Sequence, residues 1–199
     1  LNPTAIRPGY GLAEASLKVT HLPLGREVTV LQLESEALEA HRVREVEAGR
    51  PCVGCGYPTG DTQLRIVDPQ TAQPCASDRV GEIWLRGGGV ADGYWNRPEE
   101  TSAAFAARLV GEGEGAWMRT GDLGFLRDGQ LFVTGRIKDL IIRDGRNVYP
   151  QDLEQTMAAA HPALRPGCGV AFARADEHGD EEVVLVQEVR PEQAPDSDS

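Results

Sequence analysis

A strong β-hairpin signal near the middle of the chain constrains its fold more than any other feature. Two apolar runs, residues 125–126 and 131–134, flank the stretch Arg-Asp-Gly at 127–129. Asp-Gly between apolar runs indicates a hairpin, because both residues accept the positive φ angles of a tight turn. Three further runs have the alternating or β-branched character of strands: 28–33, 64–67 and 81–86. The first part of the chain is therefore expected to be rich in β-structure.

Helix signals occur in three places and make the predicted fold class mixed α/β. Arg97 is followed by Pro98 and two Glu, and these residue types suit the first turn of a helix. This helix is expected to carry apolar residues as far as Leu109. Residues 34–48 are amphipathic enough for a short helix followed by an exposed segment, and Pro150 begins a helix that runs to about Ala160.

A change of character after Arg136 predicts a second domain. Beyond it come a short strand at 139–142, the helix from Pro150, and strands at 169–173 and 182–189. We expect one domain at residues 1–136 and a small α+β domain at 137–190. The tail at 191–199 is acidic, polar and contains Pro, so it is predicted to be disordered.

Charge and hydropathy exclude several classes of partner. The net charge of −11 argues against a nucleic-acid partner, because phosphate backbones attract basic surfaces. No run of about eighteen apolar residues is available to span a bilayer. The chain opens on Leu1 without a Met or a basic, apolar leader, which suggests a piece of a longer protein.

Four cysteines give one Cys-x-x-Cys pair, Cys52 and Cys55, and two isolated residues. A zinc ribbon needs a second close pair, and a redox motif needs thioredoxin-like surroundings. Cys52 follows Pro51 and precedes Gly54 in a loop-like stretch. We interpret the four as reduced thiols of a cytoplasmic protein.

Several short motifs fall in an order that resembles the acyl-adenylate-forming, AMP-binding superfamily. They are Tyr-Gly-Leu-Ala-Glu at 10–14, Thr-Gly-Asp at 120–122, Thr-Gly-Arg-Ile-Lys-Asp at 134–139 and Gly-Arg-Asn-Val-Tyr-Pro at 145–150. The chain is similar in particular to the C-terminal portion of fatty acyl-AMP ligases. The resemblance implies that residues 1–136 end the large AMP-binding domain with a β-rich subdomain. It also implies that 137–190 is an incomplete small domain, and that 27–56 corresponds to an insertion typical of these ligases.

The resemblance assigns roles to six residues. Tyr10 and Gly11 would bind adenine, the tyrosine by stacking and its neighbours through backbone groups. Glu14 would help to hold Mg²⁺. Asp122, expected on a tight turn, would accept hydrogen bonds from the ribose hydroxyls. Arg136 would contact ribose or phosphate, and Lys138 would be the hinge of the small domain.

Asp122 and Arg136 also have simpler interpretations. An Asp after Gly most often stabilises a turn, and a single Arg is most often a surface ion-pair partner. Val148 replaces a His of the related ligases, which leaves any polar role at that position in doubt. The aromatic residues Trp84, Tyr94, Trp95, Phe105 and Trp117 are interpreted as packing residues.

The implied activity is ATP- and Mg²⁺-dependent conversion of a fatty acid to acyl-AMP, followed by transfer to the phosphopantetheine of a carrier. The carrier would be an acyl carrier protein or a carrier domain of a polyketide or peptide synthase. Two alternatives are an acyl-CoA synthetase fragment and a non-catalytic carrier-docking module of the same fold. The sequence has no Ser/Thr/Gly-rich phosphate loop with a Lys. The C-terminal catalytic Lys that the resemblance implies is also absent, because the two lysines are Lys18, in the Tyr10 segment, and Lys138, at the hinge. We therefore expect the chain to be inactive alone.

Overall fold

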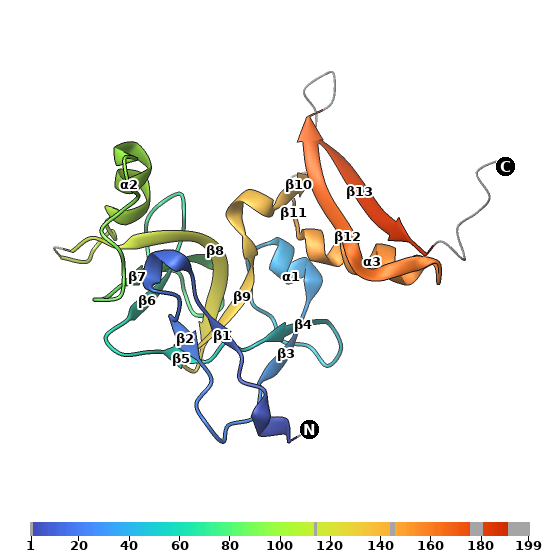
Figure 1. The fold of residues 1–199 in the computed structure, drawn as a ribbon, viewed down its shortest axis with the longest axis horizontal. Helices are drawn as coiled ribbons and strands as arrows, with labels where there is room; N and C mark the ends of the chain where they lie inside the picture. The colour runs from blue at the N-terminus through green and yellow to red at the C-terminus, as the bar shows by residue number, and fades with distance from the viewer. Residues whose placement is uncertain (1, 114, 144–145, 176–180, 191–199) are drawn as a thin grey trace. The chain divides into compact units, whose positions relative to one another are not determined.

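The chain forms two compact units, described here from a computed structural model (Figure 1). The structure describes residues 2–113, 115–143, 146–175 and 181–190, so the predicted disordered tail lies outside the described residues. Unit 1 is Leu1–Ile137 and unit 2 is Lys138–Ser199. The division falls one residue beyond the boundary expected from the sequence. Strands and helices both occur, and the predicted mixed α/β fold class is confirmed.

A four-stranded antiparallel sheet organises unit 1. Its strands, in spatial order, are β6 (Gln63–Val67), β7 (Gly81–Arg86), β8 (Met118–Arg127) and β9 (Gln130–Arg136). One face packs Ile66, Ile83 and Leu131 into a buried cluster. The other face buries Trp84 and Trp117. Because apolar side chains leave the sheet on both faces, β7 is buried along nearly its whole length.

The predicted hairpin is present between β8 and β9. Asp128 and Gly129 form its two-residue turn with φ angles of 50° and 76°. Phe125 and Phe132 lie opposite each other, and their rings stack with centroids 5.0 Å apart. The Asp-Gly signal therefore fixed both the turn and the register next to it.

Short elements surround this sheet. β1 (Gly9–Tyr10), β2 (Thr20–His21) and β5 (Tyr57–Pro58) form a small sheet, and β3 (Val30–Leu33) pairs with β4 (Arg50–Val53). Between β3 and β4 lies α1 (Ser35–Glu39), the expected short helix. The 3-10 helices are η1 (Pro3–Ala5), η2 (Ala13–Ala15) and η3 (Ile137–Asp139).

The prediction of a loop around Cys52 is wrong. Cys52 lies in β4, opposite Leu31, and is buried. Burial raises the pKa of its thiol to about 11 and also raises the pKa of Cys55. Both thiols are therefore poor nucleophiles at neutral pH.

The helix α2 (Pro98–Phe105) begins at Pro98 as predicted but ends before Leu109, which packs with Trp117 outside the helix. Trp84 and Trp117 are packing residues, as expected. Trp95 is not, because it is 90% exposed. Tyr94 is partly exposed, and its ring meets Phe105 edge-on with centroids 5.2 Å apart.

The described residues of unit 2 form two antiparallel strand pairs and one α-helix. β10 (Ile141–Arg143) pairs with β11 (Arg146–Val148), and β12 (Leu164–Ala175) pairs with β13 (Glu181–Val189). The helix α3 (Pro150–Ala160) packs on β12, where Glu154 accepts a hydrogen bond of 3.1 Å from the Ala171 amide. Among the described residues, no helix combines the length and the apolar character that crossing a membrane requires.

Candidate functional site

Asp122 lies within strand β8 and not on the tight turn that was expected. It stands opposite Arg136 of β9 in the antiparallel pair. The strand is irregular at this point, because Gly121 has a φ angle of 72° and the register shifts on both sides. A β-bulge of this kind changes the direction of a side chain within a sheet. The local signal Gly-Asp therefore marked a bulge.

Three of the predicted site residues meet at the Asp122 carboxylate. The Tyr10 hydroxyl donates a hydrogen bond of 2.6 Å to its Oδ2 atom. The Arg136 Nε atom donates one of 2.5 Å to its Oδ1 atom. Tyr10 comes from β1, 112 residues before Asp122, so only the tertiary fold brings these groups together.

The three residues Tyr10, Asp122 and Arg136 differ in their exposure to solvent. Asp122 is 6% exposed, whereas half of the Arg136 side chain is exposed to solvent. Tyr10 packs against the buried cluster of Val19 and Leu131. Burial, and secondly the Asp122 carboxylate, raise the pKa of Tyr10 well above its usual range, so its hydroxyl remains a donor. A carboxylate has about four acceptor positions, and these two hydrogen bonds leave room for further donors.

Gly11 and Glu14 lie on the same segment as Tyr10. A Cβ atom at Gly11 would overlap the backbone carbonyl of Leu17, so only glycine fits there. Glu14 accepts a hydrogen bond of 2.8 Å from the Tyr94 hydroxyl, and its carbonyl accepts one of 2.8 Å from the Ala91 amide. The described contacts of its carboxylate are thus with the segment before α2 and not with the Asp122 group.

The donor set at Glu14 fits a magnesium ion only with help from a ligand. Within the described residues, no three His, Cys, Asp or Glu side chains gather as a metal cage. Mg²⁺ is commonly held by one or two carboxylates together with phosphates and water. One carboxylate oxygen of Glu14 contacts Tyr94, which leaves the other to serve as such a ligand.

Lys138 is exposed in η3 and is the first residue of unit 2. The structure places it at the boundary between the two compact units. The hinge role of Lys138 stays a prediction.

Two residues near the site were missed as functional candidates. Tyr94 was interpreted as packing, although its hydroxyl contacts Glu14. Glu82 of β7 received no role, although the residue is 1% exposed and its carboxylate accepts a hydrogen bond of 3.1 Å from the Gly121 amide, next to Asp122. A Glu inside the otherwise apolar strand 81–85 was the signal that could have identified it.

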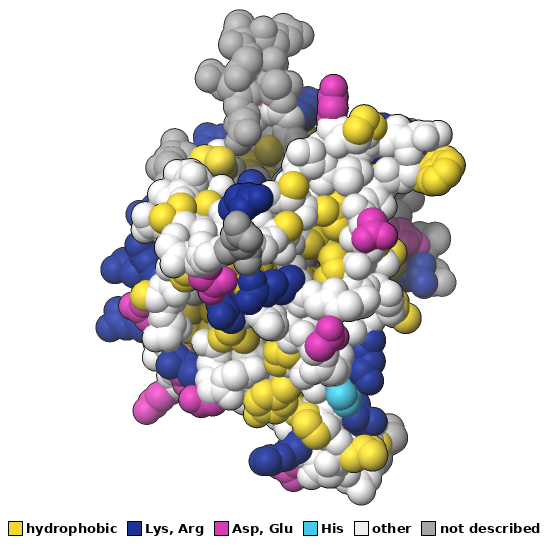
Figure 2. Space-filling model, turned by 90° about the vertical axis from the view of Figure 1, so that its left-hand side faces the viewer, with side chains coloured by type: hydrophobic (Ala, Val, Ile, Leu, Met, Phe, Trp, Pro, Cys, Tyr) yellow, Lys and Arg dark blue, Asp and Glu magenta, His cyan; other side chains and the backbone are white. Residues whose placement is uncertain are grey.

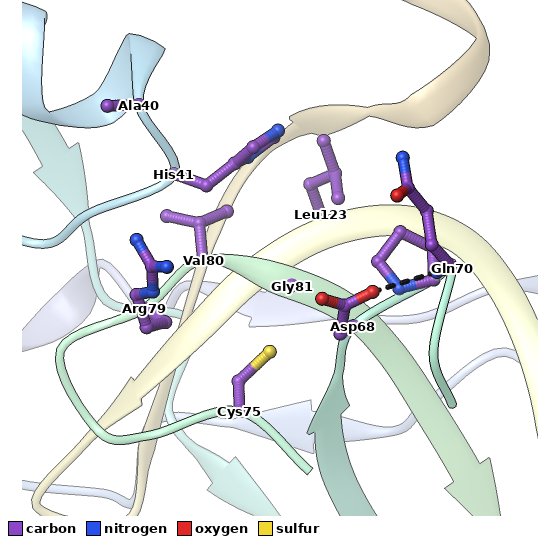
Figure 3. A pocket seen from close by; sticks show the side chains of 10 residues that line it. Ala40, His41, Asp68, Gln70, Cys75, Arg79, Val80, Gly81 and Leu123 are labelled. Atoms are coloured by element: carbon purple, nitrogen blue, oxygen red, sulfur yellow. Dashed lines mark hydrogen bonds between the residues drawn. The ribbon is translucent and has the colours of Figure 1, made fainter. Parts of the chain in front are cut away.

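A separate hollow of about 240 Å³ lies elsewhere in unit 1 (Figure 3). His41, from the turn after α1, and Asp68, after β6, line it together with Arg79. Burial, and secondly Arg79, lower the pKa of His41, and burial raises the pKa of Cys75. These shifts favour a neutral imidazole and a protonated thiol. The Cys75 thiol is therefore a weak nucleophile at neutral pH.

Basic side chains on the surface are partly compensated by acidic neighbours. Ion pairs join Arg44 to Glu34, Arg65 to Glu112, Arg97 to Glu100 and Arg127 to Glu45, over distances of 2.7 to 3.3 Å. On the face in Figure 2, Lys and Arg side chains are dispersed among uncharged, apolar and acidic ones. Exposed pairs of this kind contribute little to stability.

Relatives match nearly the whole chain. The sequence profile of the AMP-binding enzyme family matches residues 1–95. The medium-chain-fatty-acid–[acyl-carrier-protein] ligase JamA of Moorena producens (strain JHB) is 50% identical over 191 residues, which cover 93% of this chain and 32% of the relative. The 4-hydroxyphenylalkanoate adenylyltransferase of Mycobacterium tuberculosis (strain ATCC 25618 / H37Rv) is 41% identical over 194 residues, which cover 94% of this chain and 30% of the relative.

A solved structure with bound acyl adenylate and pyrophosphate has a similar fold. The fatty acyl-adenylate ligase from L. pneumophila, in complex with acyl adenylate and pyrophosphate, matches with a TM-score of 0.68 and 40% identity. The match covers 98% of this chain and 34% of that one. The chain thus spans about a third of the length of these relatives. These similarities confirm the resemblance drawn from the motifs: the chain belongs to the AMP-binding enzyme family, and its relatives there include fatty acid and fatty acyl-adenylate ligases.

Proposed function

We propose that this chain supplies the nucleotide-binding end of an ATP-dependent fatty acyl-AMP ligase. The observation that carries the proposal is the convergence of Tyr10 and Arg136 on the buried carboxylate of Asp122. A carboxylate fixed by two donors is rigid and still has acceptor capacity, which suits the paired hydroxyls of a ribose.

The other residues have distinct tasks in this proposal. Arg136 keeps half of its side chain in solvent, and its guanidinium is the proposed contact of a phosphate or a ribose oxygen. The Tyr10 ring and the backbone at Gly11 contact adenine. Lys138 is the hinge about which the small domain turns. A few backbone torsions at such a position can absorb a large rotation.

Glu14 is the proposed ligand of Mg²⁺. Bound there with the phosphates of ATP, the metal would offset the negative charge that otherwise opposes the approach of a fatty acid carboxylate. The Tyr94 hydroxyl fixes the orientation of the Glu14 carboxylate through its 2.8 Å hydrogen bond.

A carrier protein is the proposed acceptor of the acyl group. The printed name of the Moorena producens relative is that of a fatty-acid–acyl-carrier-protein ligase, and the chain shares 50% identity with it. Other relatives are named fatty-acid–CoA ligases, so coenzyme A is the second candidate. We propose a cytoplasmic enzyme, because four free cysteines are typical of a reducing compartment.

The nucleotide site is tested by calorimetric titration of the chain with AMP. We expect the chain to bind AMP, and Asp122→Asn to weaken binding by about tenfold or more, because a hydrogen bond to a charged group is lost. Asp78→Asn is the matched control, since Asp78 is exposed and its backbone carbonyl, not its side chain, accepts the hydrogen bond from the Val43 amide. Equal affinity of the two Asn variants would contradict the proposal. A chain without affinity for AMP would favour the non-catalytic docking module.

A further inference from the structure

A buried acidic side chain, Glu82, contacts the backbone next to Asp122. Glu82 is 1% exposed, and its Oε2 atom accepts hydrogen bonds of 2.8 Å from Trp84 Nε1 and 2.9 Å from Arg119 Nε. Its Oε1 atom accepts the 3.1 Å hydrogen bond from the Gly121 amide. Burying a carboxylate is costly unless every oxygen is paired, and here both oxygens are.

The position of Glu82 coincides with the bulge in β8. Glu82 stands opposite Leu123, and Trp84 stands opposite Arg119. Two steps along β7 therefore match four steps along β8, so the three residues 120–122 face the single residue Ile83. A bulge of this kind leaves backbone amides without partners in the ladder.

Side chains replace the missing ladder partners. Glu82 accepts from the amide of Gly121, and the Thr120 hydroxyl accepts from the amide of Asp122 over 3.0 Å. The same hydroxyl donates to the Ile83 carbonyl over 2.7 Å. The Gly121 amide is thus bonded directly to β7, and the Asp122 amide is connected to β7 through the Thr120 hydroxyl.

We infer that Glu82 is a positioning residue for the nucleotide site: it holds the bulge that directs the Asp122 carboxylate toward Tyr10 and Arg136. Glu82 makes none of the contacts proposed for the nucleotide, and it acts through the Gly121 amide. The inference rests on the proposed function of Asp122 as the ribose ligand.

The chemistry of the three donors requires a carboxylate. Trp84, Arg119 and Gly121 all present N–H groups, and a carboxylate is a pure acceptor. In Glu82→Gln, an amide NH₂ group would face at least one of these donors. The substitution keeps the size of the side chain and removes one acceptor oxygen, so it tests positioning with little change in packing.

The first measurement is amide hydrogen exchange in the absence of nucleotide. In the unsubstituted chain we expect protection of the Gly121 and Asp122 amides. In Glu82→Gln we expect at least about tenfold faster exchange at Gly121, while the amides of the β8–β9 hairpin turn region are unchanged. An unprotected Gly121 amide in the unsubstituted chain would overturn the inference.

The second measurement is discrimination between AMP and 2′,3′-dideoxy-AMP by calorimetry. The unsubstituted chain is expected to prefer AMP by about tenfold, because only AMP offers hydroxyls to Asp122. Glu82→Gln should bind both nucleotides about equally. The control is Glu112→Gln, since Glu112 also pairs with arginines, Arg65 at 3.1 Å and Arg86 at 3.8 Å, and both partners lie outside the bulge at 120–122.

The outcomes separate the inference from the function on which it rests. If the unsubstituted chain and Glu82→Gln both prefer AMP, the positioning role is overturned and the proposed function stands. If the unsubstituted chain binds both nucleotides equally, the proposed function fails and the positioning role falls with it. Should Glu82→Gln not fold, Glu82→Asp is measured instead, since it keeps the charge and withdraws the carboxylate from Gly121 by one methylene group.

Discussion

At the scale of single residues, Tyr10 has more to do than its motif indicates. Its resemblance to an adenine-stacking residue concerns the face of the ring, whereas the structure shows its hydroxyl bound to Asp122. A hydrogen bond to a buried carboxylate is among the stronger ones in a protein. Tyr10 therefore stabilises the fold and orients the site with the same contact.

Removing the hydroxyl should cost stability. Tyr10→Phe is expected to lower the free energy of unfolding by about 1 to 3 kcal/mol, because Asp122 loses a donor in a buried position. Urea denaturation checks this value. Tyr57→Phe is the control, since Tyr57 is 38% exposed, and this substitution should change the free energy of unfolding by less than about 0.5 kcal/mol. Equal effects of the two substitutions would contradict the account.

The same contact predicts a dependence on pH. Burial and Asp122 raise the pKa of Tyr10 in the folded chain above the usual tyrosine value of about 10. As the pH rises past about 10, the unfolded chain loses this proton first, so the stabilisation present below that pH is progressively lost.

Urea denaturation of the unsubstituted chain and Tyr10→Phe from about pH 8 to about pH 11 measures this effect. The difference in stability between the two should shrink above about pH 10. A constant difference across this range would show that the hydroxyl is not held in its protonated form by the fold.

At the scale of elements, the sequence was informative where local chemistry decides the structure. The β8–β9 turn followed from Asp128 and Gly129, and the start of α3 followed from Pro150. Strand β4 was missed because Pro51 and Gly54 usually end strands. Pro51 is tolerated there because β4 is an edge strand of a two-stranded sheet.

The same distinction between local signals and tertiary contacts applies to the candidate site. Its members Tyr10, Asp122 and Arg136 could be named from the resemblance of their motifs to those of the AMP-binding family. The bulge that orients Asp122 could not, because it depends on a register between β7 and β8 that no local pattern encodes. The roles of Glu82 and Tyr94 depend on tertiary contacts for the same reason.

The bulge itself predicts a cost for a side chain at Gly121. Its φ angle of 72° lies in the left-handed region, although a Cβ atom would meet no neighbour within 4 Å. Gly121→Ala should therefore destabilise the chain by about 1 to 2 kcal/mol through backbone strain alone.

Thermal or urea unfolding measures this cost. Gly113→Ala is the matched control, because the space at Gly113 is equally open and its φ angle is not in the positive range. Gly113→Ala should change the free energy of unfolding by less than about 0.5 kcal/mol. If the two substitutions behaved alike, the bulge geometry would be refuted.

At the scale of the whole molecule, two units divide the proposed tasks. Unit 1 contains the Asp122 group and Glu14, and unit 2 begins at Lys138. The chain spans about a third of the length of the relatives it matches. Binding of a nucleotide and catalysis are therefore separable questions for these 199 residues.

Catalysis by the chain alone is expected to be absent. Neither of its two lysines can be the C-terminal catalytic Lys that the resemblance implies, because Lys18 is near the Tyr10 segment and Lys138 is at the unit boundary. The sequence also contains no phosphate loop. Incubation with ATP, Mg²⁺ and fatty acids should give no pyrophosphate exchange above background. A full-length fatty acyl-AMP ligase is the positive control, and robust exchange by the chain would contradict this expectation.

The central claim is that Asp122, Arg136 and Tyr10 form one nucleotide site, and a crystal structure of the chain with AMP tests it most directly. We predict that the ribose hydroxyls lie within about 3 Å of the Asp122 carboxylate, with Arg136 and Tyr10 in contact with the same nucleotide. AMP bound at another place, with the Asp122 group unchanged and untouched, would contradict the claim.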